Sequence, residues 1–127
     1  MMKTGTFTGY EVTLKDPGIA WIRFNRPEQL NGMSTAIKRN LIETLTQAQM
    51  DHRVRVVVFT GTGRAFCAGD DLKSYRDGTG DALSQVPPIH GGHDCDIGTY
   101  DALRVVSQKL NTTVRDLDKL CIAAVNG

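Results

Sequence analysis

The alternation of apolar and polar residues near the start of the chain predicts a β-hairpin. Residues Tyr10 to Lys15 alternate, and residues Ile19 to Phe24 form a nearly apolar run. The turn formers Asp16-Pro17-Gly18 stand between them, in the position that a hairpin turn would occupy. The chain is therefore expected to begin with β structure.

A helix and a second kind of strand are predicted next. Apolar residues return at helical spacing after Ser34, which is a favourable N-cap residue, and this predicts a helix from about Thr35 to about Met50. Its apolar face comprises Ile37, Leu41, Ile42, Leu45 and Ala48. The β-branched run Val54 to Thr60 then predicts a strand buried on both faces, ended by Gly61-Thr62-Gly63.

The segment of about 25 residues from Ser74 to Gly98 has no convincing periodicity and contains many turn formers, so we expect a mobile loop or flap there. After a candidate cap at Thr99, helical spacing predicts a second amphipathic helix. Its apolar positions are Leu103, Val106, Leu110, Val114 and Leu117. The run Cys121 to Val125 predicts a short buried strand.

This β and α alternation predicts an α/β unit, and no further element covers the last strand. We therefore expect an incomplete unit, in which residues 1 to 127 are the amino-terminal part of a single domain. The net charge of +1, from 15 basic and 14 acidic residues, gives no basic patch for nucleic acid or an anionic membrane. The apolar runs are shorter than the roughly 20 residues of a membrane span, and no secretory signal is visible.

The three cysteines, an odd number without a spacing pattern, argue against a disulfide framework. They favour a reducing compartment, and we expect the protein to be cytoplasmic.

The segment from Gly61 to Lys73 is the best candidate for chemistry. Small residues crowd the exit of a buried strand, where backbone N–H groups can face a ligand and stabilise a developing negative charge on a carbonyl oxygen. An ordinary strand-to-helix turn, with Asp71 capping a short helix from Leu72, would use the same residues. Local sequence alone leaves both interpretations open.

Three sequence blocks resemble the crotonase superfamily, which includes the enoyl-CoA hydratases and isomerases. Phe66-Cys67-Ala68-Gly69-Asp70-Asp71-Leu72-Lys73 is similar to its Phe-x-Ala-Gly-x-Asp-Leu-Lys signature. Asn25-Arg26-Pro27-Glu28, with Leu30-Asn31-Gly32-Met33, resembles an earlier block of the family. Ile122 to Gly127 resembles the segment that leads into its second glycine-rich loop. The blocks are specific only in combination, and they span nearly the whole chain.

The resemblance implies an α/β, crotonase-like (ClpP/crotonase) fold of repeated β-β-α turns, truncated at about its midpoint. It implies an acyl-CoA substrate, with coenzyme A as part of the substrate and no separate cofactor. The backbone N–H of Asp70 would be the first oxyanion donor, and Ala68, Gly69, Asp70, Asp71, Leu72 and Lys73 would bind the substrate. Many relatives have Ala in place of Asp70, whose carboxylate would repel an enolate unless it turned away.

The resemblance also implies that the second oxyanion donor and the catalytic glutamates lie beyond Gly127. The chain alone is therefore expected to bind weakly and to be inactive. Hydration of a trans-2-enoyl-CoA, a lyase reaction, is the first expectation, with isomerisation, thioester hydrolysis and dehalogenation as alternatives within the family. A homotrimer or hexamer is implied for the complete enzyme, and a partner chain that supplies the second half is the alternative.

Other functions compete for the same residues. Asp70 and Asp71 could form an acid/base dyad, although adjacent residues of an extended turn point apart. Gly61-Thr62-Gly63 suggests a dinucleotide-binding turn, but Phe66 stands where the third glycine belongs. A cluster of possible metal ligands fits no standard zinc spacing, and we expect no metal. Its members are His90, His93, Asp94, Cys95 and Asp96. A non-catalytic half-subunit that binds CoA is a further alternative.

Overall fold

The computed structural model describes residues 1–71, 96–97, 100 and 103–127. These residues form one five-stranded sheet with the order β1-β2-β3-β4-β5. The strands are β1 (Gly5–Phe7), β2 (Tyr10–Lys15), β3 (Ile19–Phe24), β4 (Val56–Gly61) and β5 (Leu120–Ala124). The helices that lie wholly within the described residues are η1 (Pro27–Gln29), α1 (Thr35–Met50), η2 (Leu103–Gln108) and α4 (Lys109–Arg115). This arrangement confirms the predicted α/β class.

The hairpin and the first helix have the predicted bounds. β2 pairs with β3 in antiparallel register, and β3 pairs with β4 in parallel across the α1 crossover. Ser34 caps α1, because its side chain accepts a hydrogen bond from the Ile37 N–H. Together β2, β3 and α1 form one β-β-α turn.

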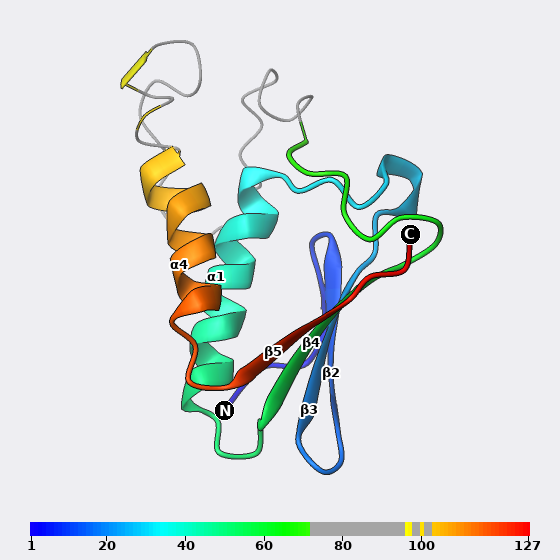
Figure 1. The fold of residues 1–127 in the computed structure, drawn as a ribbon, viewed down its shortest axis with the longest axis vertical. Coiled ribbons are helices and arrows are strands. Elements are labelled where there is room, and N and C mark those ends of the chain that lie inside the picture. The colour runs from blue at the N-terminus through cyan, green and yellow to red at the C-terminus, as the bar shows by residue number, and fades with distance from the viewer. Residues whose placement is uncertain (72–95, 98–99, 101–102) are drawn as a thin grey trace.

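The helices α1 and α4 lie side by side on one face of the sheet (Figure 1). Alternate residues of β2 and β3 point to that face, since successive side chains of a strand lie on opposite sides. The core between the two layers therefore comes from one face of each strand and one stripe of α1. It includes Tyr10, Val12, Ala20, Ile22, Phe24, Ile37, Leu41, Leu45, Ala48 and Val57.

The first strand, β1, was not predicted, and β4 begins two residues later than expected. Val57 and Val58, which point to opposite faces, are both buried, as the prediction required of the middle of this strand. The second helix is only partly as expected. Leu103–Gln108 are π-helical, Leu103 is 47% exposed, and Leu117 lies beyond the helix end.

The prediction of a buried strand at Cys121 to Val125 was wrong in burial and by one residue in position. Among the described residues, β5 pairs only with β4 and is an edge strand. Cys121 packs against the core from the helix-covered face, whereas Leu120 and Ile122 lie on the other face and are 63% and 44% exposed. Local composition indicated a strand but could not show which of its faces is covered. The predicted flap at 74–98 lies almost entirely outside the described residues, as does Thr99.

Candidate functional site

The loop after β4 folds back tightly on the end of its own strand. A Cβ at Gly61 would lie 2.7 Å from the carbonyl oxygen and 2.8 Å from the Cα of Phe66, closer than real Cβ contacts. Glycine is therefore required at the strand exit for the backbone to approach itself. No helix begins between Gly63 and Asp71, and this removes the dinucleotide-binding interpretation of the glycines.

Two of the three sequence blocks run side by side. Ala68 N–H donates to the Leu30 carbonyl at 3.0 Å, and Met33 N–H donates to the Gly69 carbonyl at 2.8 Å. The Asp71 N–H in turn donates to the Met33 carbonyl at 2.8 Å. These bonds form an isolated parallel bridge between Met33 and Asp70. The segment from Ala68 to Asp71 is therefore held as an extra strand against the loop before α1.

The bridge leaves the backbone N–H of Asp70 available. It uses the Gly69 carbonyl and the Asp71 N–H, and peptide groups alternate in direction along an extended segment. The Asp70 N–H donates to no group among the described residues. Gly69 has a φ of +102°, and a Cβ there would meet nothing within 4 Å. An N–H donor beside open space is the arrangement that can stabilise negative charge on a ligand oxygen.

A cavity of about 440 Å³ adjoins this donor and is lined by Gly69 and Asp70. Three aromatic rings from β3, β4 and the loop form part of its wall. The ring of Phe24 stacks on Phe59 at 6.2 Å between centroids and meets Phe66 edge-on at 5.7 Å. Met33, Leu41 and Leu110 add further apolar surface. The cavity suits an apolar ligand group whose polar end lies at Asp70.

The carboxylates of Asp70 and Asp71 bind different cations. Asp70 Oδ1 lies 2.5 Å from Lys38 Nζ on α1, whereas Asp71 Oδ2 lies 3.1 Å from an Arg26 guanidinium nitrogen. Each carboxylate is thus directed to a different element of the fold. The geometry gives no support to an acid/base dyad formed by the two side chains.

Lys38 is a site residue that the sequence interpretation missed. Its side chain is 6% exposed, and it lines the cavity together with Ser107, whose Oγ accepts a 3.0 Å hydrogen bond from Nζ. The signal was present in the sequence: Lys38 stands three and seven residues before Leu41 and Leu45, on the buried face of α1. A charged residue at such a position needs a partner, and here Asp70 supplies one.

Two asparagines fix the shape of the loop. Asn31 Nδ2 donates to the carbonyls of Thr62 and Ala65 at 3.0 and 2.7 Å. Asn126 Nδ2 donates to the carbonyls of Gly63 and Ala65 at 2.9 and 3.3 Å. The third sequence block therefore meets the other two at this loop, close to the end of the chain in Figure 1. Both asparagines belong to the blocks noted above, but their sequence context did not reveal this role.

Of the predicted substrate-binding residues, Gly69 and Asp70 line the cavity, Ala68 and Asp71 flank them in the bridged segment, and Leu72 and Lys73 lie outside the described residues. Of the proposed metal ligands only Asp96 is described, and its side chain is exposed. Within the described ranges, no three His, Cys, Asp or Glu side chains gather as a metal site would require. Cys67 and Cys121 are free thiols.

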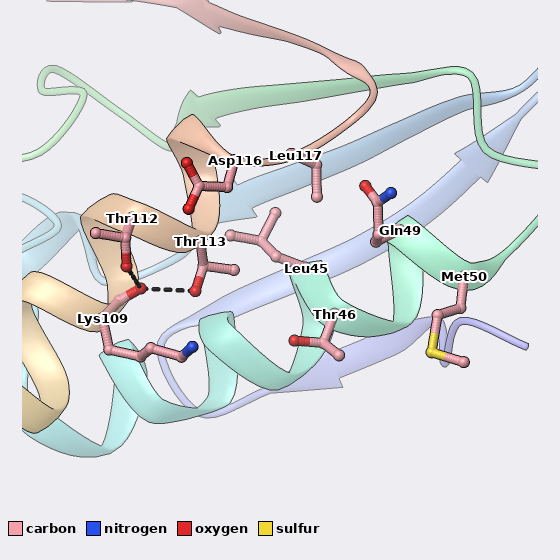
Figure 2. Close-up of a pocket in the computed structure, with 9 residues that line it drawn as sticks. All are labelled: Leu45, Thr46, Gln49, Met50, Lys109, Thr112, Thr113, Asp116 and Leu117. Carbon is pink, nitrogen blue, oxygen red and sulfur yellow. Dashed lines mark hydrogen bonds between the residues drawn. The ribbon is translucent and has the colours of Figure 1, made fainter.

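A second cavity, of about 360 Å³, lies between α1 and α4 (Figure 2). Thr112 and Thr113 both donate to the Lys109 carbonyl of their own helix, at 3.1 and 2.6 Å. Gln49 is bonded to Asp118 through both its amide atoms. These polar groups already have hydrogen-bond partners within the protein. We therefore interpret this cavity as a gap between packed helices rather than as a second candidate site. Within the described parts of the chain, no helix combines the length and apolar character needed to cross a membrane.

Comparison with known proteins gives relatives whose descriptions agree with one another. The family described as enoyl-CoA hydratase/isomerase matches residues 15–87, more than half of the chain. A 1,2-epoxyphenylacetyl-CoA isomerase of Escherichia coli is 35% identical over 115 residues, which are 88% of this chain and 38% of that protein. A hydroxycinnamoyl-CoA hydratase-lyase of Pseudomonas fluorescens is 41% identical over 73 residues, or 55% of this chain and 26% of that protein.

The solved structures agree in fold. The enoyl-CoA hydratase from Bacillus anthracis matches with a TM-score of 0.72 and 30% identity over 94% of this chain and 40% of that chain. The chain thus spans 40% or less of the length of each of these three proteins.

Proposed function

The chain belongs to the enoyl-CoA hydratase/isomerase family, and from that premise we propose that it supplies the first oxyanion donor for an acyl-CoA thioester. The donor is the backbone N–H of Asp70. The observation that carries this proposal is the bridge with Met33, which holds Asp70 in place while using only the peptide groups on either side of it. Asp70 lines a mainly apolar cavity in which an acyl group can lie.

The reaction we propose is hydration of a trans-2-enoyl-CoA. The oxygen of water bonds to C3 while a base takes one of its protons, and the electrons of the C2–C3 double bond move onto the thioester oxygen as an enolate. The Asp70 N–H stabilises that charge, and the enolate collapses when C2 takes a proton. The same oxyanion would serve isomerisation, thioester hydrolysis or dehalogenation, and the relatives include both a hydratase-lyase and an isomerase.

We propose that the second oxyanion donor and the acid/base carboxylates come from polypeptide outside this chain, in keeping with the smaller span of the chain relative to its relatives. Residues 68–73 would contact the substrate, with Lys73 near the CoA phosphates. Coenzyme A is part of the substrate, and no other cofactor is required. A trimer or hexamer located in the cytoplasm completes the proposal.

Replacing Gly69 with Val tests the donor. Gly69→Val places a branched side chain in the open space beside the Asp70 N–H and strains a backbone with φ +102°. Loss of one oxyanion donor costs about 10²- to 10³-fold in rate. We therefore expect kcat/KM of the native protein for crotonyl-CoA, followed by the loss of enoyl absorbance, to fall at least about 100-fold.

Gly5→Val is the matched control, because Gly5 also has a positive φ of +123° and open space around its Cβ, but lies in β1, away from the cavity. The control should keep wild-type activity. Equal activity of the two variants would contradict the assignment of the donor. Turnover by the 127-residue chain alone would contradict the proposed location of the acid/base groups.

A further inference from the structure

The cavity contains an ion pair that an alkyl-binding pocket does not need. Lys38 is 6% exposed, and its Nζ contacts both Asp70 Oδ1 and Ser107 Oγ. The three residues form a polar strip in a wall that is otherwise largely apolar. Burial of a charged group costs free energy unless it is paired, and even a good pair seldom repays that cost in full. The strip therefore lowers the stability of the fold, and a role in ligand binding would explain why it is retained.

The incomplete burial of Asp70 indicates what the ligand must provide. Its side chain is 46% exposed although that of its partner is almost covered, and it lines the cavity. The only interaction of this carboxylate with the described residues is the pair with Lys38, made through Oδ1. Water can solvate the other oxygen, Oδ2, when the cavity is empty. A ligand that fills the cavity displaces this water and must offer a hydrogen-bond donor in its place, or a carboxylate oxygen is left unsatisfied.

The charges of Asp70 and Lys38 further limit the kind of ligand group that the cavity can bind. An anionic group would be repelled by Asp70 and a cationic group by Lys38, because both charges line the same cavity. A neutral hydroxyl is repelled by neither charge and can both donate and accept a hydrogen bond. Its hydrogen can bond to Asp70, and its oxygen can accept from the hydroxyl of Ser107, whose own oxygen already accepts from Lys38.

We propose that the Lys38, Asp70 and Ser107 strip selects acyl groups that carry a hydroxyl close to the thioester carbonyl. The inference rests on the proposed function, since it takes the cavity to be the acyl pocket. It makes Lys38 a specificity-determining residue that holds Asp70 in place. A site built to bond a substrate hydroxyl discriminates strongly against the analogue that lacks it.

The test compares butyryl-CoA with 2-hydroxybutyryl-CoA and 4-hydroxybutyryl-CoA, neither of which arises by hydration of a trans-2-enoyl ester. Their affinities for the native protein are measured by titration calorimetry. At least one hydroxylated ester should bind about 10-fold or more tightly than butyryl-CoA. The double variant Lys38→Met with Asp70→Ala removes both charges together and leaves no orphan charge behind. It should lose the preference, so that the hydroxylated esters bind no more tightly than butyryl-CoA.

Lys3→Met, a loss of one charge at the exposed amino terminus, is the control and should keep the preference. Equal wild-type affinity for all three esters would overturn this inference and leave the oxyanion assignment standing. A preference that persists in the double variant would also overturn it, because other residues would then recognise the hydroxyl. Failure of every ester to bind the wild type would instead contradict the proposed function itself.

Discussion

Asn31 organises the loop that presents the proposed donor. It is 2% exposed, its φ is +57°, and its side chain bonds three backbone groups. Oδ1 accepts from the Arg26 N–H, and Nδ2 donates to the carbonyls of Thr62 and Ala65. Asparagine suits this position because it tolerates left-handed backbone and offers both an acceptor and two donors.

Asn31→Ala should destabilise the protein strongly. The change removes three partly buried hydrogen bonds, and unsatisfied buried groups cost roughly 1–3 kcal/mol each, less where water can reach them. We expect a loss of about 3 kcal/mol in the free energy of unfolding, measured by urea denaturation. Asn40→Ala in the middle of α1 is the control and should be neutral or slightly stabilising, because alanine favours helix. A loss no larger than that of the control would show that the loop holds its shape without Asn31.

At the residue scale, sequence patterns located the donor segment but not the side chains that support it. Small residues after a β-branched run are visible locally, and so Ala68 to Asp71 could be singled out. Lys38, which pairs with Asp70 of this segment, and Asn126, which bonds to Ala65 in the loop before it, come from distant parts of the chain. Without a fold, no local rule connects a helix lysine to a loop aspartate 32 residues away.

At the element scale, α1 shows which features sequence predicts well. Its cap, its apolar period and both of its ends are local, and its observed bounds match the expected ones. Its carboxyl end also has a long-range support: Lys119 Nζ donates to the carbonyls of Ala48 and Asp51 at 2.5 and 2.6 Å. A cation there also complements the helix dipole.

Ser34→Ala tests the cap. The variant loses the side-chain acceptor for the Ile37 N–H, and N-cap losses cost about 1 kcal/mol. Thermal unfolding should therefore show a lower midpoint for Ser34→Ala than for the wild type. Ser34→Asp keeps an acceptor and places a negative charge at the positive end of the dipole, so it should restore the midpoint. If both variants unfolded alike, the cap would contribute nothing.

The elements that sequence predicted poorly owe their state to neighbours. β5 has a typical strand composition, but Leu120 and Ile122 are exposed because nothing among the described residues covers the face of β5 opposite the helices. β1 is three residues long and depends on pairing with β2. The π-helical turn of η2 keeps apolar residues at nearly helical spacing, so the period cannot distinguish it from an α-helix.

At the scale of the whole molecule, a buried carboxylate ties the amino terminus to the junction of α1 and β4. Asp51 is 5% exposed, and its Oδ2 accepts from the Met2 N–H at 2.8 Å and from the Arg53 guanidinium at 2.7 Å. Hydrogen bonds from the Arg53 side chain, followed by those from the Met2 and Arg53 backbone, hold the pKa of Asp51 well below its usual range.

This lowered pKa predicts a particular acid sensitivity. An aspartate in the unfolded chain titrates near pH ~3.9, so Asp51 binds protons more readily when unfolded. The contribution of ionised Asp51 to the stability of the fold is complete above the pH at which the unfolded aspartate titrates. This contribution is lost as the pH falls toward the lower pKa of the folded state. Asp51→Asn should therefore be less stable than the wild type at pH 7, and the gap should narrow in urea denaturation at pH 3. A gap that is independent of pH would contradict the linkage.

The bonds of Asn126 to the loop also affect the order in which the chain folds during its synthesis. Asn126 lies 61 residues after Ala65, whose carbonyl it shares with Asn31. Ribosomes add about 5–20 residues per second, so roughly 3–12 s pass between synthesis of the loop and synthesis of its second clamp. During that interval Asn31 alone can hold the nascent loop. The loop that presents the proposed donor is thus fixed in two stages, first by Asn31 and then by Asn126. A nascent chain reaches its final geometry at this loop only after β5 has joined the sheet.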